Sequence, residues 1–319
     1  KLAIFMILSG LSINEAKERL SKNKGFPNYH TFTQIEQIHK GWSDDQKYYI
    51  ENAYGEKLLL RISDITEFER KKSEYNSLCE LVKKDIPMSV PKEFGICNNG
   101  KNVYMLLTWI EGEDAEKIIP TLPVQKQYEL GLKAGQILKQ IHSIPSPPTQ
   151  EDWALYFNKK INRKIEGYKN CGIHLEGEDR FFTYIDEHRH LLVNRIQSLH
   201  HGDYHIGNML ITPEGELSII DFNRLDNGDP WEEFNRIVWC ASCSKYFASG
   251  RIDGYFNHDV PYLFWQLLAL YISSNTLSSI YWAIPFGKSE LETMINQFQD
   301  VLDWYDQMSN PIPKWYESV

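Results

Sequence analysis

The sequence predicts an α+β protein in which a small part with a β-sheet precedes a larger, mainly helical part. Strand-like runs separated by turn residues lie before residue 110, whereas apolar residues recur at helical spacing through most of the chain after residue 112. Two short apolar runs at 209–211 and 217–220 add a hairpin within the helical part. With 319 residues and 42% hydrophobic content, the chain can bury substantial cores.

In the first part, residues 47–51 and 57–62 are strand-like runs joined by a turn that contains Gly55. Apolar residues between 66 and 83 recur close to the helical period, which predicts a helix. Residues 102–110 form an apolar run that ends at a sharp change to acidic residues. This change predicts a boundary between a lobe of residues 1–110 and a lobe of residues 111–319.

In the second part, six segments alternate apolar and polar residues at helical spacing. These segments are Val124 to His142, Trp153 to Tyr168, Arg180 to Gln197, Pro230 to Ala248, Val260 to Tyr281 and Lys288 to Met308.

The stretch from His201 to Asn208 carries the strongest chemical signal. Phosphoryl transfer needs an in-line nucleophile and metal ions that neutralise the phosphate oxygens. Asp203 would orient a substrate hydroxyl and accept its proton, and Asn208, five residues later, would bind magnesium. The hairpin then returns Asp221 beside Asn208, so one carboxylate and one carboxamide supply the hard oxygen ligands that magnesium prefers.

His-Gly-Asp, four further residues and Asn, with Ile-Asp-Phe beyond, resemble the catalytic segment of aminoglycoside phosphotransferases and related small-molecule kinases such as choline kinase. The resemblance implies a two-lobed protein-kinase-like fold with an amino-terminal antiparallel sheet. It also implies that His201 supports the loop and that His205 approaches the transferred phosphate. Both histidines could equally be structural imidazoles.

The same resemblance implies a nucleotide site in the first lobe. Arg61 stands where the family uses a strand cation, often Lys, against the nucleotide phosphates, and Glu74 would pair with it. Glu67, Glu69 and Glu80 compete with Glu74 for this role.

The sequence has no Gly-x-Gly-x-x-Gly motif. By the same resemblance, a shorter nucleotide loop stands in its place, in which the Ser43 hydroxyl would face phosphate. Backbone groups near Thr108 and Ile110 would bind the purine edge. The donor would be ATP or GTP, with Mg²⁺ as cofactor.

The Gly-Asp-Pro segment at residues 228–230 also matches the family. It implies that Glu233 braces the catalytic loop through backbone amides, although the family more often has Asp there. We expect Asp229 to be structural, because a carboxylate before a helix can cap it.

The net charge of −9 argues against nucleic-acid binding and allows a cationic acceptor. Carboxylates that could line such a pocket are Glu176, Glu178, Asp179, Asp226, Asp303 and Asp306, most of which we expect on the solvated surface.

Five cysteines indicate a reducing compartment, and Cys240 and Cys243 are better explained as buried thiols than as a zinc site. The apolar residues 2–8 are too few to span a bilayer. We expect them to lead into a helix capped by Ser12 with Glu15, and we expect no membrane partner and a cytoplasmic location.

Three functions remain open. The first is an O-phosphotransferase that acts on a hydroxylated small molecule such as an aminoglycoside-like antibiotic and confers antibiotic resistance. The second is a metabolite kinase for choline, a sugar, a ribose derivative or a macrolide-like compound. A nucleotide-binding pseudokinase is disfavoured, because Asp203, Asn208 and Asp221 are all present.

Overall fold

The computed structural model describes residues 29–39 and 45–317, which form two compact units. The first unit contains the residues up to Ala115 and Asn208–Leu225; the second contains Glu116–Gly207 and the residues from Asp226 onward. The boundary after residue 110 that the sequence indicates stays a prediction. The expected helix at Ser12 lies outside the described residues.

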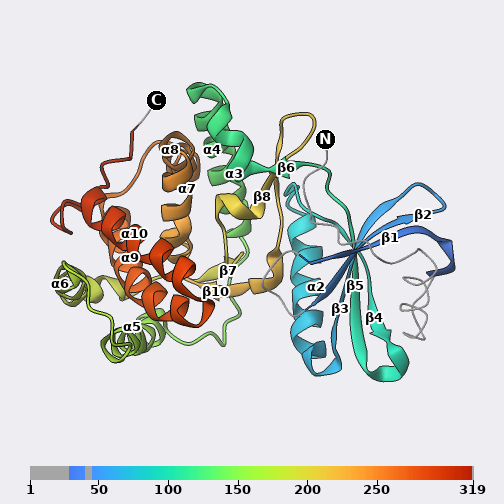
Figure 1. The fold of residues 1–319 in the computed structure, drawn as a ribbon, viewed down its shortest axis with the longest axis horizontal. Helices are drawn as coiled ribbons and strands as arrows, with labels where there is room; N and C mark the ends of the chain where they lie inside the picture. Colours follow the sequence, from blue (N-terminus) through green and yellow to red (C-terminus); the bar gives the residue numbers. More distant parts are fainter. Residues whose placement is uncertain (1–28, 40–44, 318–319) are drawn as a thin grey trace. The chain divides into compact units, whose positions relative to one another are not determined.

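The first unit contains a five-stranded sheet in which every neighbouring pair is antiparallel, in the order β1-β2-β3-β5-β4 (Figure 1). The expected antiparallel sheet is therefore confirmed. Its strands are β1 (Phe32–Ile38), β2 (Gln46–Asn52), β3 (Lys57–Asp64), β4 (Pro91–Cys97) and β5 (Asn102–Thr108).

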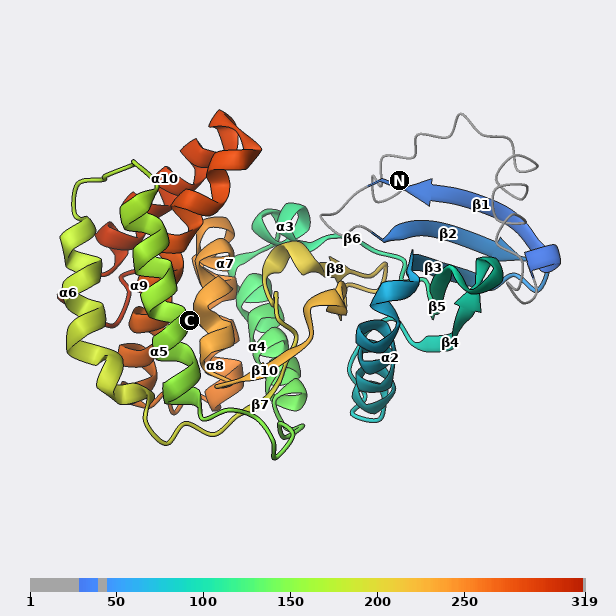
Figure 2. The ribbon, with the colours of Figure 1, turned by 90° about the horizontal axis from the view of Figure 1, so that it is seen from below.

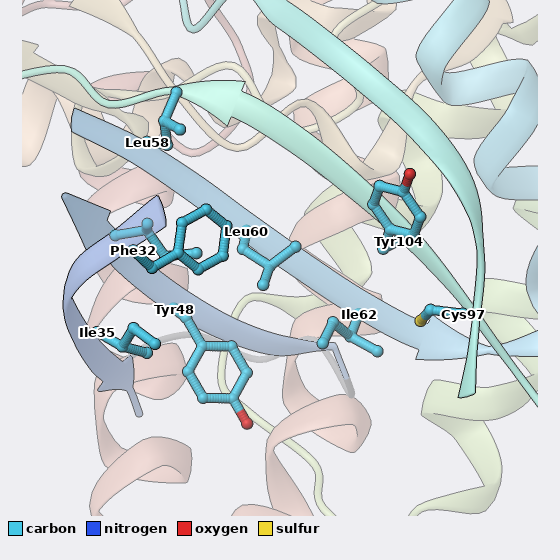
Figure 3. Packing of buried hydrophobic residues seen from close by; sticks show 9 residues of the cluster. Phe32, Ile35, Tyr48, Leu58, Leu60, Ile62, Cys97 and Tyr104 are labelled. Carbon is cyan, nitrogen blue, oxygen red and sulfur yellow. The ribbon is translucent and has the colours of Figure 1, made fainter. Parts of the chain in front are cut away.

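Side chains of β3 alternate between the two faces of the sheet, so one strand contributes both to the apolar core and to the face that carries Arg61. Leu58, Leu60 and Ile62 point into one apolar cluster with residues of β1 and β2 (Figure 3). Arg61, between two of them, points to the opposite face, because side chains of a strand alternate. Helix α2 (Phe68–Val82) packs beside β4 and β5 and carries the partner of Arg61.

A smaller antiparallel sheet completes the first unit. It contains β6 (Glu113–Asp114), β8 (Met209–Ile211) and β9 (Leu217–Ile219), so the predicted hairpin forms. Its turn is closed by a hydrogen bond from Thr212 N–H to the Glu216 carbonyl, and Gly215 adopts a φ of 81° that favours glycine.

The second unit is mainly helical (Figure 2). Its helices are α4 (Val124–Ile141), α5 (Trp153–Asn170), α6 (Glu178–His188), α7 (Ile237–Cys243), α8 (Lys245–Phe256), α9 (Tyr262–Ala283) and α10 (Lys288–Trp304), and α3 (Ala115–Ile118) enters it from the first unit. Helix α9 contacts α5, α6 and α10. Strands β7 (Ser198–His200) and β10 (Asp226–Gly228) form a short antiparallel pair.

Close packing of α4 against α8 depends on glycine at the contact. A Cβ at Gly135 would collide with the Arg251 carbonyl oxygen, and a Cβ at Gly250 would collide with the Tyr128 carbonyl oxygen. Backbone therefore approaches backbone along this interface. None of the helices in the described part of the chain has the length and apolar character that a membrane span requires.

Two of the six predicted helices differ most in extent from the structure. The segment from Pro230 to Ala248 contains a 3₁₀ segment, η8 (Glu232–Arg236), then α7 and the start of α8. Ser244 breaks it, because its backbone is extended and its hydroxyl caps α8 by accepting the Phe247 N–H. The segment from Arg180 to Gln197 ends as an α-helix at His188.

Candidate active site

Glu233 holds the catalytic loop in the second unit. Its Oε2 accepts the His201 N–H at 3.0 Å, and its Oε1 accepts the Gly202 N–H at 2.5 Å. His142 Nε2 lies 2.9 Å from Oε2. Burial opposes ionisation, but the hydrogen bond with His142 and nearby histidines lower the pKa of Glu233 to about 2. The expected brace therefore forms, with His142 as a partner that the sequence did not reveal.

Asp203 is half-buried at the end of this braced loop. Its carboxylate Oδ1 lies 3.4 Å from Arg236 Nε and 3.7 Å from His205 Nε2. Its backbone N–H donates to His201 Nδ1 at 3.3 Å, and His201 is fully buried. The loop thus fixes the backbone of Asp203 and leaves the carboxylate among polar groups.

Burial favours the neutral form of His205. Burial lowers its pKa to about 4, with Asp203 acting in the opposite direction and Arg236 lowering the pKa further. Its Nδ1 accepts the Gly207 N–H at 3.1 Å, so the ring proton lies on Nε2, the nitrogen that faces Asp203. In its neutral form, His205 can donate a hydrogen bond from Nε2 but cannot form an ion pair.

The two predicted magnesium ligands lie at the hairpin in the first unit. The Ile220 N–H donates to the Asn208 carbonyl at 3.0 Å, which places the residue before Asp221 against Asn208. Asp221 has a φ of 65°, an uncommon conformation for a non-glycine residue. Such strain concentrates at functional sites.

Asp221 and Asn208 fit a magnesium ion by their chemistry. Within residues 29–39 and 45–317, the half-buried Asp221 carboxylate makes no hydrogen bond or ion pair. A hard carboxylate and a carboxamide oxygen are suitable ligands when nucleotide phosphates and water complete an octahedron. The described residues contain no group of three or more His, Cys, Asp or Glu side chains able to hold a metal ion.

Arg61 and Glu74 form the expected pair in the first unit. Arg61 Nη1 donates to Glu74 Oε1 at 2.6 Å, and both side chains are buried. Burial would lower the pKa of Arg61, but Glu74 and Asp45 raise it above its ordinary value. Of the four glutamates that competed for this role, the structure therefore selects Glu74.

Two charged residues beside this pair were not predicted. Asp45 Oδ2 accepts from Arg61 Nη2 at 2.5 Å and from Lys71 Nζ at 2.6 Å, and its Oδ1 accepts from Ser63 Oγ at 2.7 Å. Lys71 also lies 3.5 Å from Glu74. The spacing of Lys71 and Glu74 on one helix is the only sequence signal that could have indicated this network.

Of the two residues predicted to bind the purine edge, Thr108 already uses its backbone N–H within the described ranges and Ile110 does not. The Thr108 N–H already donates to the Val90 carbonyl at 2.9 Å, whereas the Ile110 backbone makes no hydrogen bond in the described part of the chain. Ile110 is therefore the better candidate. Ser43 lies outside the described residues.

Asp229 is structural, as expected. Its Oδ1 accepts the N–H of Trp231, the residue before η8, at 3.0 Å, but η8 has no side-chain cap; the fully buried carboxylate also binds Arg195 and the Tyr271 hydroxyl. It therefore joins the segment after the hairpin to helix α9.

The structure divides the candidate residues between the two units. Arg61, Glu74, Asn208 and Asp221 belong to the first unit, and His201, Asp203 and His205 belong to the second. Asp203 and Asn208 are separated by only four residues of chain.

Comparison with known proteins identifies the family of the chain. Residues 34–264 match the model of the phosphotransferase enzyme family. No curated protein matches the chain by sequence.

Several solved structures share the fold. A choline/ethanolamine kinase family protein from Mesorhizobium loti is 14% identical with a TM-score of 0.65, over 93% of this chain and 97% of that one. The GDP complex of wild-type aminoglycoside 2'-phosphotransferase-IIIa is 13% identical with a TM-score of 0.63, over 86% and 94%. A mutant of aminoglycoside phosphotransferase APH(4)-Ia with ADP and hygromycin B is 14% identical with a TM-score of 0.58, over 85% and 94%.

Proposed function

Because this chain belongs to the phosphotransferase enzyme family and has the two-lobed kinase-like fold, we propose that it transfers the terminal phosphate of ATP or GTP to a hydroxyl of a small molecule. The chain is a small-molecule kinase. The donor nucleotide, the acceptor and the roles of single residues belong to the proposal.

In the proposed reaction, Asp203 accepts the proton of the acceptor hydroxyl while the hydroxyl oxygen attacks the terminal phosphorus. The bond from phosphorus to the nucleoside diphosphate breaks, so the products are the phosphorylated acceptor and the diphosphate. His205 Nε2–H, 3.7 Å from Asp203, would donate a hydrogen bond to the transferred phosphate.

Asn208 and Asp221 would hold Mg²⁺, which when bound neutralises charge on the phosphate oxygens. Arg61, held by Glu74, would direct its remaining N–H groups to phosphate, and Ser43 would contribute its hydroxyl. Thr108 and Ile110 would meet the purine. A reaction that consumes nucleoside triphosphate favours a cytoplasmic location, which stays a prediction.

The observation that carries the proposal is the double hydrogen bond from the loop backbone to Glu233. It fixes the loop so that the half-buried Asp203 carboxylate keeps a defined position, which general-base catalysis requires. Asp221, with no partner of its own in the described residues, supports the same proposal.

For the acceptor, an aminoglycoside-like antibiotic and a metabolite both remain candidates. Structural neighbours include proteins of both kinds. One specific observation favours a metabolite: the basic Arg236 contacts Asp203 and lies near a second basic side chain, Lys164. A polycationic antibiotic would meet like charge there.

Replacing Asp203 with Asn tests the proposed base. Asn keeps the size of the side chain but cannot accept the proton, so turnover should fall by about 10²- to 10⁴-fold. Nucleotide affinity should stay within about twofold, because the residue does not bind the nucleotide in this mechanism. The assay measures ATP and GTP consumption with aminoglycosides, macrolides, sugars, sugar phosphates and amino alcohols. Turnover close to that of the wild type would remove Asp203 from the base role.

A further inference from the structure

Arg236, on η8, contacts the proposed base, and two lysines of α5 lie near residues of the same η8 segment. Arg236 Nε lies 3.4 Å from Asp203 Oδ1, and Lys160 Nζ lies 3.6 Å from Glu232 Oε1. Lys164 follows Lys160 by one turn of α5, so both point to the same side of that helix. All five side chains are half-buried rather than fully solvated.

Of these three basic residues, Lys164 is the one that has no carboxylate partner among the described residues. Its Nζ donates to Asn275 Oδ1 on α9 at 3.3 Å, a neutral partner, and no carboxylate of the described residues lies within ion-pair distance. Burial lowers the pKa of Lys164 to about 7; Lys160 and Arg236 act in the same direction, and Glu232 opposes them. In this environment, a bound anion would favour the protonated, positively charged form of the lysine.

The two nearest carboxylates are already matched with other cations. Glu232 is matched by Lys160, and Asp203 is matched by Arg236. Asp226 adds only a weaker, exposed negative charge near Lys160. Lys164 is therefore left without a carboxylate partner of its own in the described part of the chain, near the Arg236 that contacts the base.

Resting on the proposed phosphotransfer, we propose that the acceptor carries an anionic group, a carboxylate or a phosphate, which binds Lys164 with Lys160 and Arg236 beside it, while the acceptor hydroxyl lies at Asp203. This arrangement makes Lys164 a specificity-determining residue, since charge near a site both attracts the matching ligand and repels like charge.

Of the acidic residues that the sequence offered for a cationic pocket, Asp226 interacts electrostatically with Lys160, whereas Glu178 and Asp306 have other partners. Glu178 accepts hydrogen bonds from the Tyr168 hydroxyl and the Leu175 N–H, and Asp306 pairs with Lys314. The others are exposed: Glu176, Asp179, Asp226 and Asp303.

Affinity labelling with pyridoxal 5'-phosphate tests this site without an identified acceptor. Its aldehyde condenses with an unprotonated amine, with loss of water, and borohydride reduces the imine to a stable amine. Pyridoxal, which lacks the phosphate, is the matched neutral probe. Mass spectrometry of the full-length chain should find Lys164 labelled at a concentration of pyridoxal 5'-phosphate about tenfold lower than that of pyridoxal.

Lys159 is the internal control for this labelling, because it lies on the same helix but is exposed and paired with Glu151. Preferential labelling of Lys159, or equal labelling of Lys164 by both probes, would overturn the inference. Protection of Lys164 by Mg²⁺ and ATP alone would also overturn it, because the anion would then come from the nucleotide.

Kinetics with Lys164→Gln provides the second arm. With an anionic acceptor, the KM for the acceptor should rise at least about tenfold while the KM for nucleotide stays unchanged, and Lys164→Arg should restore part of the affinity. Lys159→Gln should change neither constant. The Tm of Lys164→Gln should not fall, because the fold loses a partly buried charge.

The outcomes separate the inference from the proposed function. Turnover of a cationic acceptor that is insensitive to Lys164→Gln would overturn the anionic acceptor and keep the phosphotransferase. A wild-type chain that binds no nucleotide would count against the phosphotransferase itself, and the labelling would still decide whether Lys164 binds anions.

Discussion

Four charged side chains are buried together in the first unit, and their charges cancel. Asp45 and Glu74 face Arg61 and Lys71, and every cation meets a carboxylate. Because removal of one partner from such a group leaves an uncompensated buried charge, the group resists single substitutions. Arg61 uses one N–H on each of its three nitrogens, so one N–H on each terminal nitrogen remains for a phosphate oxygen.

Replacing Glu233 with Gln tests the brace of the catalytic loop. The fold lowers the pKa of Glu233 from 4.5 to about 2, so its ionised form stabilises the native state above pH 4.5. This contribution is lost as the pH falls from about 4.5 to about 2. The linkage relation limits it to about 3 kcal/mol.

Urea unfolding at several pH values measures the effect. At pH 7 the Gln variant should be less stable than the wild type, and the difference should shrink as the pH falls below 4.5. The exposed Glu129→Gln controls for the loss of one carboxylate. A difference that does not change with pH would contradict the lowered pKa of Glu233.

Sequence spacing was sufficient for some of these residues and insufficient for others. Glu74 was selected by the resemblance, and Glu233 by its place after the Gly-Asp-Pro segment; both make the contacts expected of them. Asp45 and Lys71 were not predicted, because an acidic residue in a turn and a lysine on a charged helix look like solvated surface. Only the tertiary structure brings them to Arg61.

Among the secondary-structure elements, long periodic helices and short hairpins were the most predictable. Helices α4, α5 and α9 begin within two residues of their predicted starts, because the apolar period persists through their length. The break at Ser244 was not predictable in this way, because the apolar pattern continues across a residue whose hydroxyl caps the next helix. Strand β4 was missed, since its burial hardly alternates.

Replacing Gly135 with Ala tests the contact between α4 and α8. The new Cβ would meet the Arg251 carbonyl oxygen, which is backbone and cannot rotate away, so the helices must separate. We expect a loss of about 3 kcal/mol or more in the free energy of unfolding. Calorimetry should show a clearly lower Tm, whereas Gln136→Ala, at the exposed neighbouring position, should change it little. A Tm equal to that of the wild type would mean that the helices are not packed this closely.

For the whole molecule, the family match fixes the reaction class more firmly than it fixes the acceptor. The net charge of −9 suggested a cationic acceptor, but Asp203 contacts the basic Arg236, and Lys164 lies near Arg236. Net charge describes the average surface and not a single recess. Acceptor specificity was therefore not predictable from composition, because it depends on which side chains of α5 and η8 come together.

In the proposed mechanism, the two units have separate tasks. The proposed base lies in the second unit, and the proposed metal ligands lie in the first. If this division is correct, a substitution in one unit should affect turnover alone, and a substitution in the other should affect binding of the metal–nucleotide complex.

Isothermal titration calorimetry of Mg²⁺–ATP with Asp221→Asn and Asp203→Asn tests this division most directly. Asn tolerates the positive φ of residue 221, so the first variant removes the charge and keeps the backbone. We predict that Asp221→Asn weakens binding of Mg²⁺–ATP by at least about tenfold, and that Asp203→Asn binds within about twofold of the wild type. Equal affinity of Asp221→Asn and the wild type for Mg²⁺–ATP would contradict a metal site at the hairpin.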